Sequence, residues 1–389
     1  MGAVNNPIEK AQMARTVRIL ILGAAYGAGH LQAGLALQTA LAHIRPEWET
    51  KACNFIEMVN PEFDRFSRQF YLFLVRYFPA CYGWFYRLTD IAKPRQGYLL
   101  DRFGCKRLKQ FLDDYRPCLV VATFPTPGRV AATLKLEGKS QVPVVMVITD
   151  HTAHAQWIHP GVDLYLVPDE GVKKLLLQRG VSPEKVRVTG IPIHPSFTAI
   201  PERLAARRRL GLSEKVPVVL VVGGGNGRVT AMEEMCSVLS SILPLAQIIV
   251  IAGKDREYQE LLYSKFKQDP RFHFYGFVEN MAEFMAAADL LVGKAGALTL
   301  AEAAAVGVPV IIYRCLPAQE EANALYYTRS GAALRVQNQE ELAFWVEKIL
   351  QNTDGIATSL RQAIRQMACP RAAFDSALTI AKLIEQLRV

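Results

Sequence analysis

A histidine follows a glycine-rich turn near the start of the chain. Residues 23–30 read Gly-Ala-Ala-Tyr-Gly-Ala-Gly-His and lie between an apolar run and a stretch with helical spacing. Gly27 and Gly29 allow a ligand to approach the backbone closely, and the free N–H groups of the following helix attract polar or anionic groups. His30 is therefore either a general base that accepts a proton near neutral pH or a helix-start residue that faces solvent.

A second glycine-rich loop follows the apolar run 218–222. It contains four glycines within residues 223–227 and precedes another helical stretch. Backbone N–H groups in a loop of this kind bind phosphate, and the dipole of the next helix favours negative charge. We therefore expect phosphate recognition in the second half of the chain.

Acidic and amide side chains follow two later apolar runs. Glu302 lies about two turns into the helix expected after residue 292, and Gln319 and Glu320 follow the run 308–313. A carboxylate can accept paired hydrogen bonds from neighbouring hydroxyls. Beside a phosphate loop, this set suits a nucleotide sugar better than a nicotinamide cofactor. Taken singly, each acidic residue is more often part of a solvated helix face.

The elements that position these residues are short runs rich in Val, Ile and Leu, separated by helical stretches. Continuous rather than alternating apolarity is typical of parallel strands buried on both faces. The fold class is therefore α/β, with two units of Rossmann type. The predicted strands are residues 17–22, 119–122, 142–148, 164–167, 186–188, 218–222, 248–252, 272–275, 290–292 and 308–313.

A proline-rich stretch divides the chain. Three prolines within residues 190–201 break helices and central strands, and we place the interdomain linker there. The predicted domains are residues 1–195 and 196–369. Residues 370–389 carry apolar side chains at every third or fourth position, which predicts a C-terminal helix.

Composition restricts the compartment and the partners. Of 389 residues, 51% are hydrophobic and 21% charged, which excludes a disordered or fibrous protein. The net charge of +9 favours nucleic acid, phosphorylated metabolites or an anionic membrane surface. Seven widely spaced cysteines without a C-x-x-C pair indicate a reducing compartment. Because we find neither a secretory signal nor an apolar run that could span a membrane, we expect a cytoplasmic protein.

The aromatic-basic segment, residues 61–109, departs from the α/β pattern. Eleven of the residues 63–86 are aromatic, and the whole segment carries +6 of the net +9. Rings and cations together suit an anionic membrane surface, although a core helix with a basic face or a nucleic-acid groove has the same composition. The side chains expected to contact a membrane or an acceptor here are Phe70, Tyr71, Phe73, Trp84 and Phe85.

Ordered motifs along nearly the whole chain resemble those of glycosyltransferase family 28, in particular its monogalactosyldiacylglycerol synthases and processive diacylglycerol glucosyltransferases. Besides the aromatic-basic segment, the motifs are GAGH (27–30), ITDHTAHAQWIHPGVD (148–163), TGIPI (189–193), GGGNG (223–227), GFVENM (276–281), GKAGALTLAEA (293–303) and PAQEEAN (317–323). His151 departs from the family, which usually has an apolar or aromatic residue there. Ala297 and Leu298 stand where plant-type galactolipid enzymes have proline and glycine.

The resemblance implies a GT-B fold, in which two Rossmann-like domains face each other across a cleft and the C-terminal helix crosses back to the first. It implies that the first domain holds the acceptor and the second the UDP-sugar. Carried over to this sequence, Gly224 and Gly225 bind the diphosphate, Phe277 and Val278 flank uracil, and Glu302 binds the ribose. The same motifs imply a hexose site at Gln319 and Glu320 and further UDP-sugar contacts at Asn226, Gly296, Thr299 and Asn323.

The resemblance also makes His30 the general base of an inverting transfer from a UDP-hexose to diacylglycerol. Asp150, at a strand end, is expected to orient His30 or the acceptor, and Trp157 to lie at the acceptor site. We expect no cofactor and no metal, since the chain has no D-x-D. The implied partners are a UDP-hexose (UDP-glucose or UDP-galactose), diacylglycerol and an anionic membrane surface to which the enzyme binds peripherally. Because the glycine loops account for phosphate recognition, we expect no nucleic-acid partner.

Two other activities remain open at this point. One is transfer of N-acetylglucosamine to a polyprenyl-linked peptidoglycan precursor, against which the long aromatic insertion counts. The other is a UDP-sugar epimerase of similar fold, which would act without lipid. A binding module without catalysis is disfavoured because His30, Glu302, Gln319 and Glu320 are all present.

Overall fold

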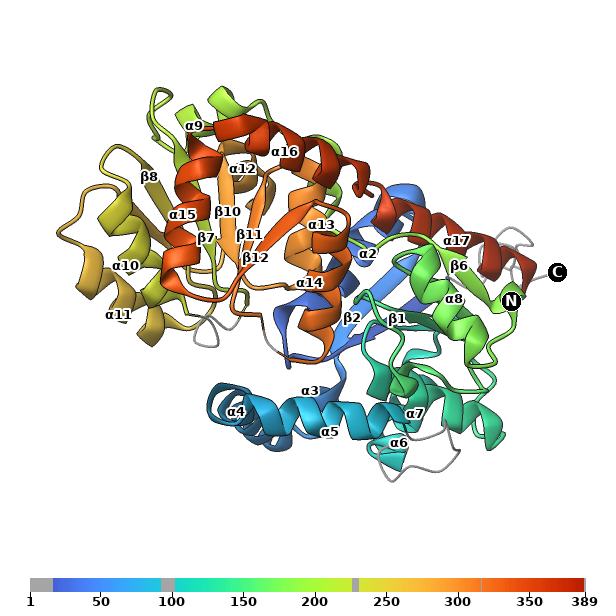
Figure 1. Ribbon diagram of the computed structural model, residues 1–389. Helices are drawn as coiled ribbons and strands as arrows, with labels where there is room; N and C mark the ends of the chain where they lie inside the picture. The colour runs from blue at the N-terminus through green and yellow to red at the C-terminus, as the bar shows by residue number, and fades with distance from the viewer. Residues whose placement is uncertain (1–16, 92–101, 226–230, 316, 388–389) are drawn as a thin grey trace, which may run out of the picture.

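Two parallel sheets, each covered by helices, form the molecule (Figure 1). The computed structural model describes residues 17–91, 102–225, 231–315 and 317–387. The first sheet has the order β2-β1-β3-β4-β5-β6. Its strands are β1 (Arg18–Gly23), β2 (Glu49–Asn54), β3 (Leu119–Ala122), β4 (Val144–Val147), β5 (Leu164–Val167) and β6 (Val186–Val188).

The second sheet repeats the arrangement with the order β12-β11-β10-β7-β8-β9. Its strands are β7 (Val218–Val222), β8 (Gln247–Ile251), β9 (Phe272–Tyr275), β10 (Leu290–Gly293), β11 (Val310–Tyr313) and β12 (Ala333–Val336). All ten predicted strands are therefore present, and the α/β prediction is confirmed. The continuous apolarity has the expected cause, because every residue of β3, β4, β7 and β10 is buried.

Two strands were missed by the sequence pattern. They are β2, with the sequence Glu-Thr-Lys-Ala-Cys-Asn, and β12, with Ala-Leu-Arg-Val. Each is an edge strand that pairs on one side only. Because an edge strand is partly exposed, its sequence carries polar residues and lacks the apolar run that marks a central strand.

Helices cover both faces of each sheet. Those of the first half are α2 (Ala28–Ile44), α3 (Phe55–Val59), α4 (Pro61–Tyr77), α5 (Pro79–Ile91), α6 (Cys105–Tyr115), α7 (Pro125–Leu136) and α8 (Glu170–Gln178). Those of the second half are α9 (Arg203–Arg209), α10 (Met232–Ile242), α11 (Arg256–Phe266), α12 (Met281–Ala287), α13 (Ala297–Val306), α14 (Gln319–Arg329), α15 (Gln339–Leu350), α16 (Ile356–Gln366) and α17 (Ala372–Gln386). Short 3₁₀ helices are η2 (Ala155–Trp157), η3 (Pro183–Lys185), η4 (Pro195–Thr198) and η5 (Thr353–Gly355).

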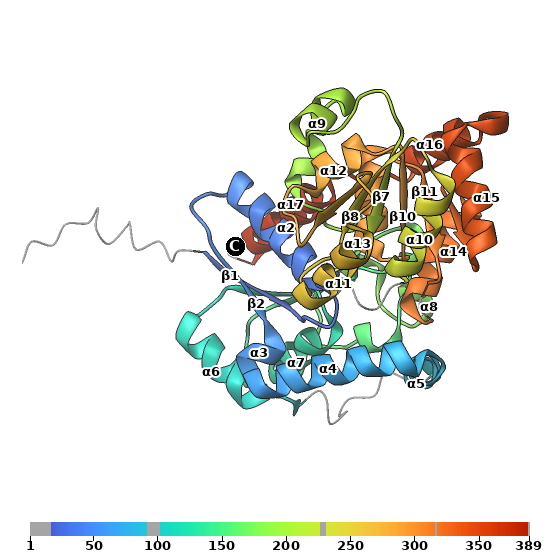
Figure 2. The same ribbon diagram turned by 90° about the vertical axis from the view of Figure 1, so that its left-hand side faces the viewer.

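The C-terminal helix α17 belongs spatially to the first domain. Figures 1 and 2 show it running from α16 on the second domain to α2 on the first. One face of it is buried with the first sheet, and Arg45 of the first domain forms an ion pair with Glu385. The chain thus crosses between domains twice. At the first crossing, Ile193 and Phe197 both pack into the core of the second domain.

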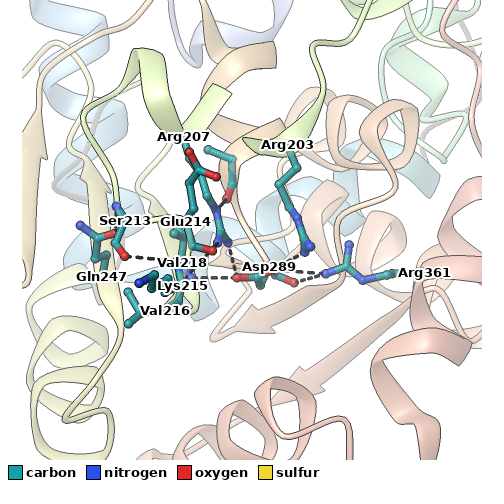
Figure 3. Close-up of polar contacts among 11 residues, drawn as sticks. Arg203, Arg207, Ser213, Glu214, Lys215, Val216, Val218, Gln247, Asp289 and Arg361 are labelled. Carbon is teal, nitrogen blue, oxygen red and sulfur yellow. Dashed lines mark hydrogen bonds and ion pairs between the residues drawn. The ribbon is translucent and has the colours of Figure 1, made fainter. Parts of the chain in front are cut away.

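A cluster of three arginines surrounds Asp289 at the beginning of β10 (Figure 3). Its carboxylate accepts hydrogen bonds from Arg203 and Arg207 and from the backbone N–H of Val218, which is 2.9 Å away. Arg361 donates to its backbone oxygen. The Arg207 side chain is only 4% exposed, so its charge depends on Asp289 for compensation. The cluster fastens α9 and α16 to the second sheet.

Replacing Asp289 with Asn should destabilise the second domain by about 3 kcal/mol, because it leaves the buried Arg207 guanidinium without a counter-charge. Urea unfolding followed by tryptophan fluorescence measures the loss. Arg203→Ala is the matched control, since the Arg203 side chain is 49% exposed and an exposed pair contributes below about 1 kcal/mol. Equal losses for the two variants would contradict this explanation.

Candidate active site

A cavity of about 570 Å³ lies between the two domains. Both domains line it, and ten of the residues predicted for binding sites contribute to its walls. They are Gly27, Gly29, Tyr71, Gly224, Gly225, Phe277, Val278, Gly296, Thr299 and Glu302. The structure thus brings together residues that are up to 275 positions apart in the chain. Nine of them lie in the segments that follow the carboxyl ends of strands, whereas Tyr71 lies within α4.

The two glycine-rich loops touch each other. A Cβ atom added at Gly225 would lie 2.0 Å from the Cβ of Ala28, so no larger residue fits between the domains at this point. Gly224 has a φ of 73°, and a Cβ there would come within 2.8 Å of the Lys294 side chain. Close approach and positive φ explain why glycine occupies these two positions. Asn226, predicted to bind the UDP-sugar, lies outside the described residues.

Glu302 is a half-buried residue whose carboxyl group lies in the cavity wall. Removal from water raises its pKa to about 8, so the carboxyl group is mainly protonated at neutral pH. Among the residues that the structure describes, no hydrogen bond or ion pair satisfies it. A carboxyl group without a protein partner, facing a cavity, is suited to bind hydroxyl groups of a ligand.

The start of α14 carries two more predicted binding residues. Glu320 is buried and paired with Lys294, and Gln319 Oε1 accepts a hydrogen bond of 3.1 Å from the Tyr82 hydroxyl of α5. Ala318, directly before them, has a φ of 79° and a ψ of −124°, which is strained for a residue with a Cβ. The packing around the start of α14 therefore imposes the direction in which Gln319 and Glu320 point.

His30 lies on the first domain beside the cavity. Its Nδ1 is 2.9 Å from the hydroxyl of Thr149, and its ring contacts Phe124 edge to face at 5.0 Å. Burial lowers the pKa of His30, while the nearby charge of Asp150 opposes the shift, so the imidazole is neutral at pH 7. If Nδ1 carries the proton and donates to Thr149, Nε2 keeps a lone pair and can act as a base. Thr149 is a residue that the sequence analysis did not select.

His30 lines a second, smaller cavity of about 200 Å³ between α2 and the first sheet. Leu35 lines both cavities. Apolar side chains make up much of the wall of the smaller one.

Asn323 joins the two domains. Its Nδ2 donates to Asp150 Oδ1 at 3.0 Å and to the carbonyl of Ala295, and its Oδ1 accepts from the backbone N–H of His151 at 2.8 Å. It is 1% exposed. Asp150 was expected to orient His30 or the acceptor; in the structure its Oδ1 accepts a hydrogen bond from Asn323, and its charge acts on His30. The motif predicted Asn323 as a UDP-sugar contact, and it did not predict this hydrogen-bonded bridge between the domains.

His151 packs between the domains next to Asn323. Its ring stacks on Tyr326 of α14 at 3.8 Å, and its Nδ1 lies 2.7 Å from a carboxylate oxygen of Asp169. An aromatic partner on α14 explains how an imidazole fits a position where the family usually has an apolar or aromatic side chain.

Two lysines of the cavity were missed. Lys254 lies 4.6 Å from the centre of the Phe277 ring, and Lys294 pairs with Glu320. Each directly follows a glycine: Lys294 follows Gly293, which ends β10, and Lys254 follows Gly253, two residues after β8. Lys294 also lies within the motif GKAGALTLAEA. That position was an available signal, since a cation beside a phosphate loop adds to the attraction of its amides.

The aromatic-basic segment forms α4 and α5 in its described part. Phe70, Phe73, Trp84 and Phe85 are each at least 50% exposed, whereas Tyr71 turns inward to the cavity. No helix among the described residues is long and apolar enough to cross a membrane. Four of the five selected aromatics are thus on the surface and one lines the cavity.

The expectation for Trp157 is corrected. Trp157 is 3% exposed and packs in the core of the first domain, where η2 meets α7. An aromatic residue in an otherwise polar motif can fill a core, and the sequence did not distinguish the two uses. The neighbouring His154 and His159 bond to the Tyr86 carbonyl and to Thr133. In the described ranges, no group of three or more His, Cys, Asp or Glu residues could hold a metal ion.

Comparison with known proteins assigns the family. The model described as monogalactosyldiacylglycerol (MGDG) synthase matches residues 30–193, and that of the glycosyltransferase family 28 C-terminal domain matches residues 218–385. A processive diacylglycerol beta-glucosyltransferase of Bacillus cereus (strain B4264) is 32% identical over 365 residues, covering 93% of this chain and 92% of that protein. The chain belongs to glycosyltransferase family 28. The resemblance drawn from the motifs is confirmed.

Solved structures with low identity share the fold of this family 28 protein. Acinetobacter baumannii MurG has a TM-score of 0.61 at 18% identity, with 94% of this chain and 99% of that one covered. The UDP-GlcNAc 2-epimerase of Neisseria meningitidis bound to UDP-GlcNAc has a TM-score of 0.62 at 13% identity, covering 94% and 100%. The predicted GT-B fold is confirmed. Since an epimerase shares it, the family and not the fold identifies this enzyme as a glycosyltransferase.

Proposed function

We propose that this glycosyltransferase transfers glucose from UDP-glucose to the free hydroxyl of diacylglycerol, with inversion, to form a β-glucosyl diacylglycerol. The observation that carries the proposal is the cavity between the domains, whose wall holds the glycine loop 223–225 and the carboxyl of Glu302 and extends to Gly29, next to the neutral imidazole of His30. The 32% identity over 93% of the chain to a diacylglycerol beta-glucosyltransferase supports both the sugar and the acceptor.

The donor is assigned to the second domain. The N–H groups around Gly224 and Gly225 would bind the diphosphate, with Lys294 nearby, and Phe277 and Val278 would flank uracil. Glu302 would accept hydrogen bonds from the two ribose hydroxyls. Gln319 and Glu320 would bind the hexose hydroxyls. Gly296, Thr299 and Asn323 would complete the UDP-sugar site, as would Asn226.

The reaction needs a stronger nucleophile and a stabilised leaving group. Nε2 of His30 would take the proton of the acceptor hydroxyl. At the same time, the oxygen of that hydroxyl would attack the anomeric carbon from the face opposite the diphosphate. The bond from the anomeric carbon to the diphosphate oxygen breaks, and UDP carries away the electron pair. Loop amides and the α13 dipole would stabilise the charge that develops on UDP. Attack from the opposite face converts the α-linked donor into a β-glycoside.

The acceptor is assigned to the first domain and the membrane surface. Gly27 and Gly29 let a substrate approach His30, and the exposed rings of α4 and α5 would enter the headgroup level. Basic residues of the aromatic-basic segment would meet anionic lipid. The enzyme would thus work from the cytoplasmic face as a peripheral protein and take its lipid substrate without removing it fully from the bilayer.

The proposal is tested by incubation with radiolabelled UDP-glucose, UDP-galactose or UDP-N-acetylglucosamine in mixed micelles that contain diacylglycerol. We expect labelled β-glucosyl diacylglycerol from UDP-glucose as the main product. His30→Ala should lower kcat roughly 10²- to 10⁴-fold, because it removes the base, and leave UDP affinity unchanged. Conversion of the UDP-sugar without lipid would indicate an epimerase, and full turnover by His30→Ala would refute its role.

Binding of UDP-glucose should depend on pH through Glu302. The carboxylate is the form that accepts two ribose hydrogen bonds, and its pKa of about 8 means that the free enzyme must lose a proton to bind. Affinity should therefore fall as the pH drops below 8, by up to about tenfold per pH unit. Calorimetric titration from about pH 6 to 8 measures it. The Glu302→Gln variant should bind UDP-glucose weakly, and its affinity should not depend on pH in this range. If the variant kept the pH profile of the wild type, Glu302 would not be the group that causes it.

A further inference from the structure

Helices α4 and α5 meet at a sharp corner (Figures 1 and 2), and this α4–α5 corner has two faces with different surroundings. Its outer face presents large exposed aromatics, among which Phe66 is 66% and Trp84 64% exposed. Its inner face is turned to the second domain, where Tyr71 lines the cavity and Tyr82 bonds to Gln319. Figure 1 shows α5 along one edge of the molecule, below α14. One structural element therefore connects an apolar surface with the proposed hexose site.

The contact with α14 is close and directional. A Cβ added at Gly83 would lie 2.9 Å from the Cβ of Pro317, so α5 packs directly against the turn that begins α14. Tyr71 and Tyr82 meet edge to face at 5.7 Å, which fixes the Tyr82 ring. Burial raises the pKa of Tyr82, so its hydroxyl keeps the proton that it donates.

The hydrogen bond from Tyr82 sets the orientation of the Gln319 amide. Because Oε1 accepts from Tyr82 at 3.1 Å, the NH₂ group of Gln319 is left to donate to a ligand. Without the Tyr82 hydroxyl, the amide can rotate and present oxygen in place of nitrogen. A hexose hydroxyl would then lose its donor, and the pocket would discriminate less between sugars that differ in the direction of one hydroxyl.

We infer that Tyr82 is a positioning residue for the donor hexose, through which binding of the α4–α5 corner to lipid controls the hexose subsite. The inference rests on the proposed function, since it takes Gln319 as a hexose ligand. It predicts that lipid improves binding of the sugar end of the donor and leaves binding of its nucleotide end unchanged. The exposed Trp84 and Phe85 then move together with Tyr82, because all three side chains belong to the one helix α5.

The test uses calorimetric titration of the full chain with UDP and with UDP-glucose, in the absence of any acceptor. Tyr82→Phe should bind UDP-glucose about fivefold more weakly and UDP as the wild type does. Its preference for UDP-glucose over UDP-galactose should shrink by a similar factor. Tyr86→Phe is the matched control, because it removes a hydroxyl one turn further along α5 that makes no contact with Gln319, and it should bind both ligands normally.

The lipid arm adds vesicles of phosphatidylglycerol and phosphatidylcholine. The wild type should bind UDP-glucose at least twofold more tightly with vesicles, and UDP equally with and without them, whereas Tyr82→Phe should show no gain. The inference is overturned if Tyr82→Phe keeps wild-type affinity, if it loses UDP and UDP-glucose affinity equally, or if vesicles leave the wild type unchanged. Wild-type protein that binds no UDP-sugar would instead overturn the proposed function.

Discussion

The interaction on which the active site depends is the Asn323 bridge. One buried amide bonds to Asp150, to the backbone of His151 and to the backbone of Ala295, and so joins the two domains next to the cavity residues Lys294 and Gly296. An unsatisfied buried amide costs about 1–3 kcal/mol per lost partner, so the bridge favours one relative position of the domains. The glycine loops reinforce it, since Gly225 fits against Ala28 only in the absence of a side chain. His30 and the proposed donor site lie in different domains, and this joint brings them together.

The same closeness of the domains tunes the reactive groups. Removal from water raises the pKa of Glu302 and lowers that of His30, so each group favours its neutral form at neutral pH. A neutral histidine beside a charged Asp150 suits a base that must accept a proton and become a cation. A protonated Glu302 suits a site that releases its proton only when hydroxyls arrive. Burial at one interface therefore accounts for opposite pKa shifts and for both proposed roles.

The sequence predicted the central strands and most of the cavity wall because those features leave local patterns. Apolar runs mark β3, β4, β7 and β10, and glycines mark the turns that follow strands, whereas the edge strands β2 and β12 carry no such run. Contacts between distant segments leave no such trace. The hydrogen bond between Thr149 and His30 joins residues 119 positions apart, and that between Tyr82 and Gln319 joins residues 237 positions apart. A tryptophan such as Trp157 can fill a core or lie at a binding surface, and the sequence around it does not distinguish the two. The expected roles of the site residues came from the family resemblance, whereas their hydrogen-bond partners are seen only in the structure.

The most direct measurement is a crystal structure of the complex with UDP-glucose. If the Asn323 bridge holds the two domains in the position that forms the site, Asn323 remains bonded to Asp150 in this complex. The diphosphate then lies on the Gly224–Gly225 amides, and the anomeric carbon faces the His30 side of the cavity. The contrary result is a donor bound to the second domain with the hexose turned away from His30, or domains that part so that the Asn323–Asp150 hydrogen bond is lost.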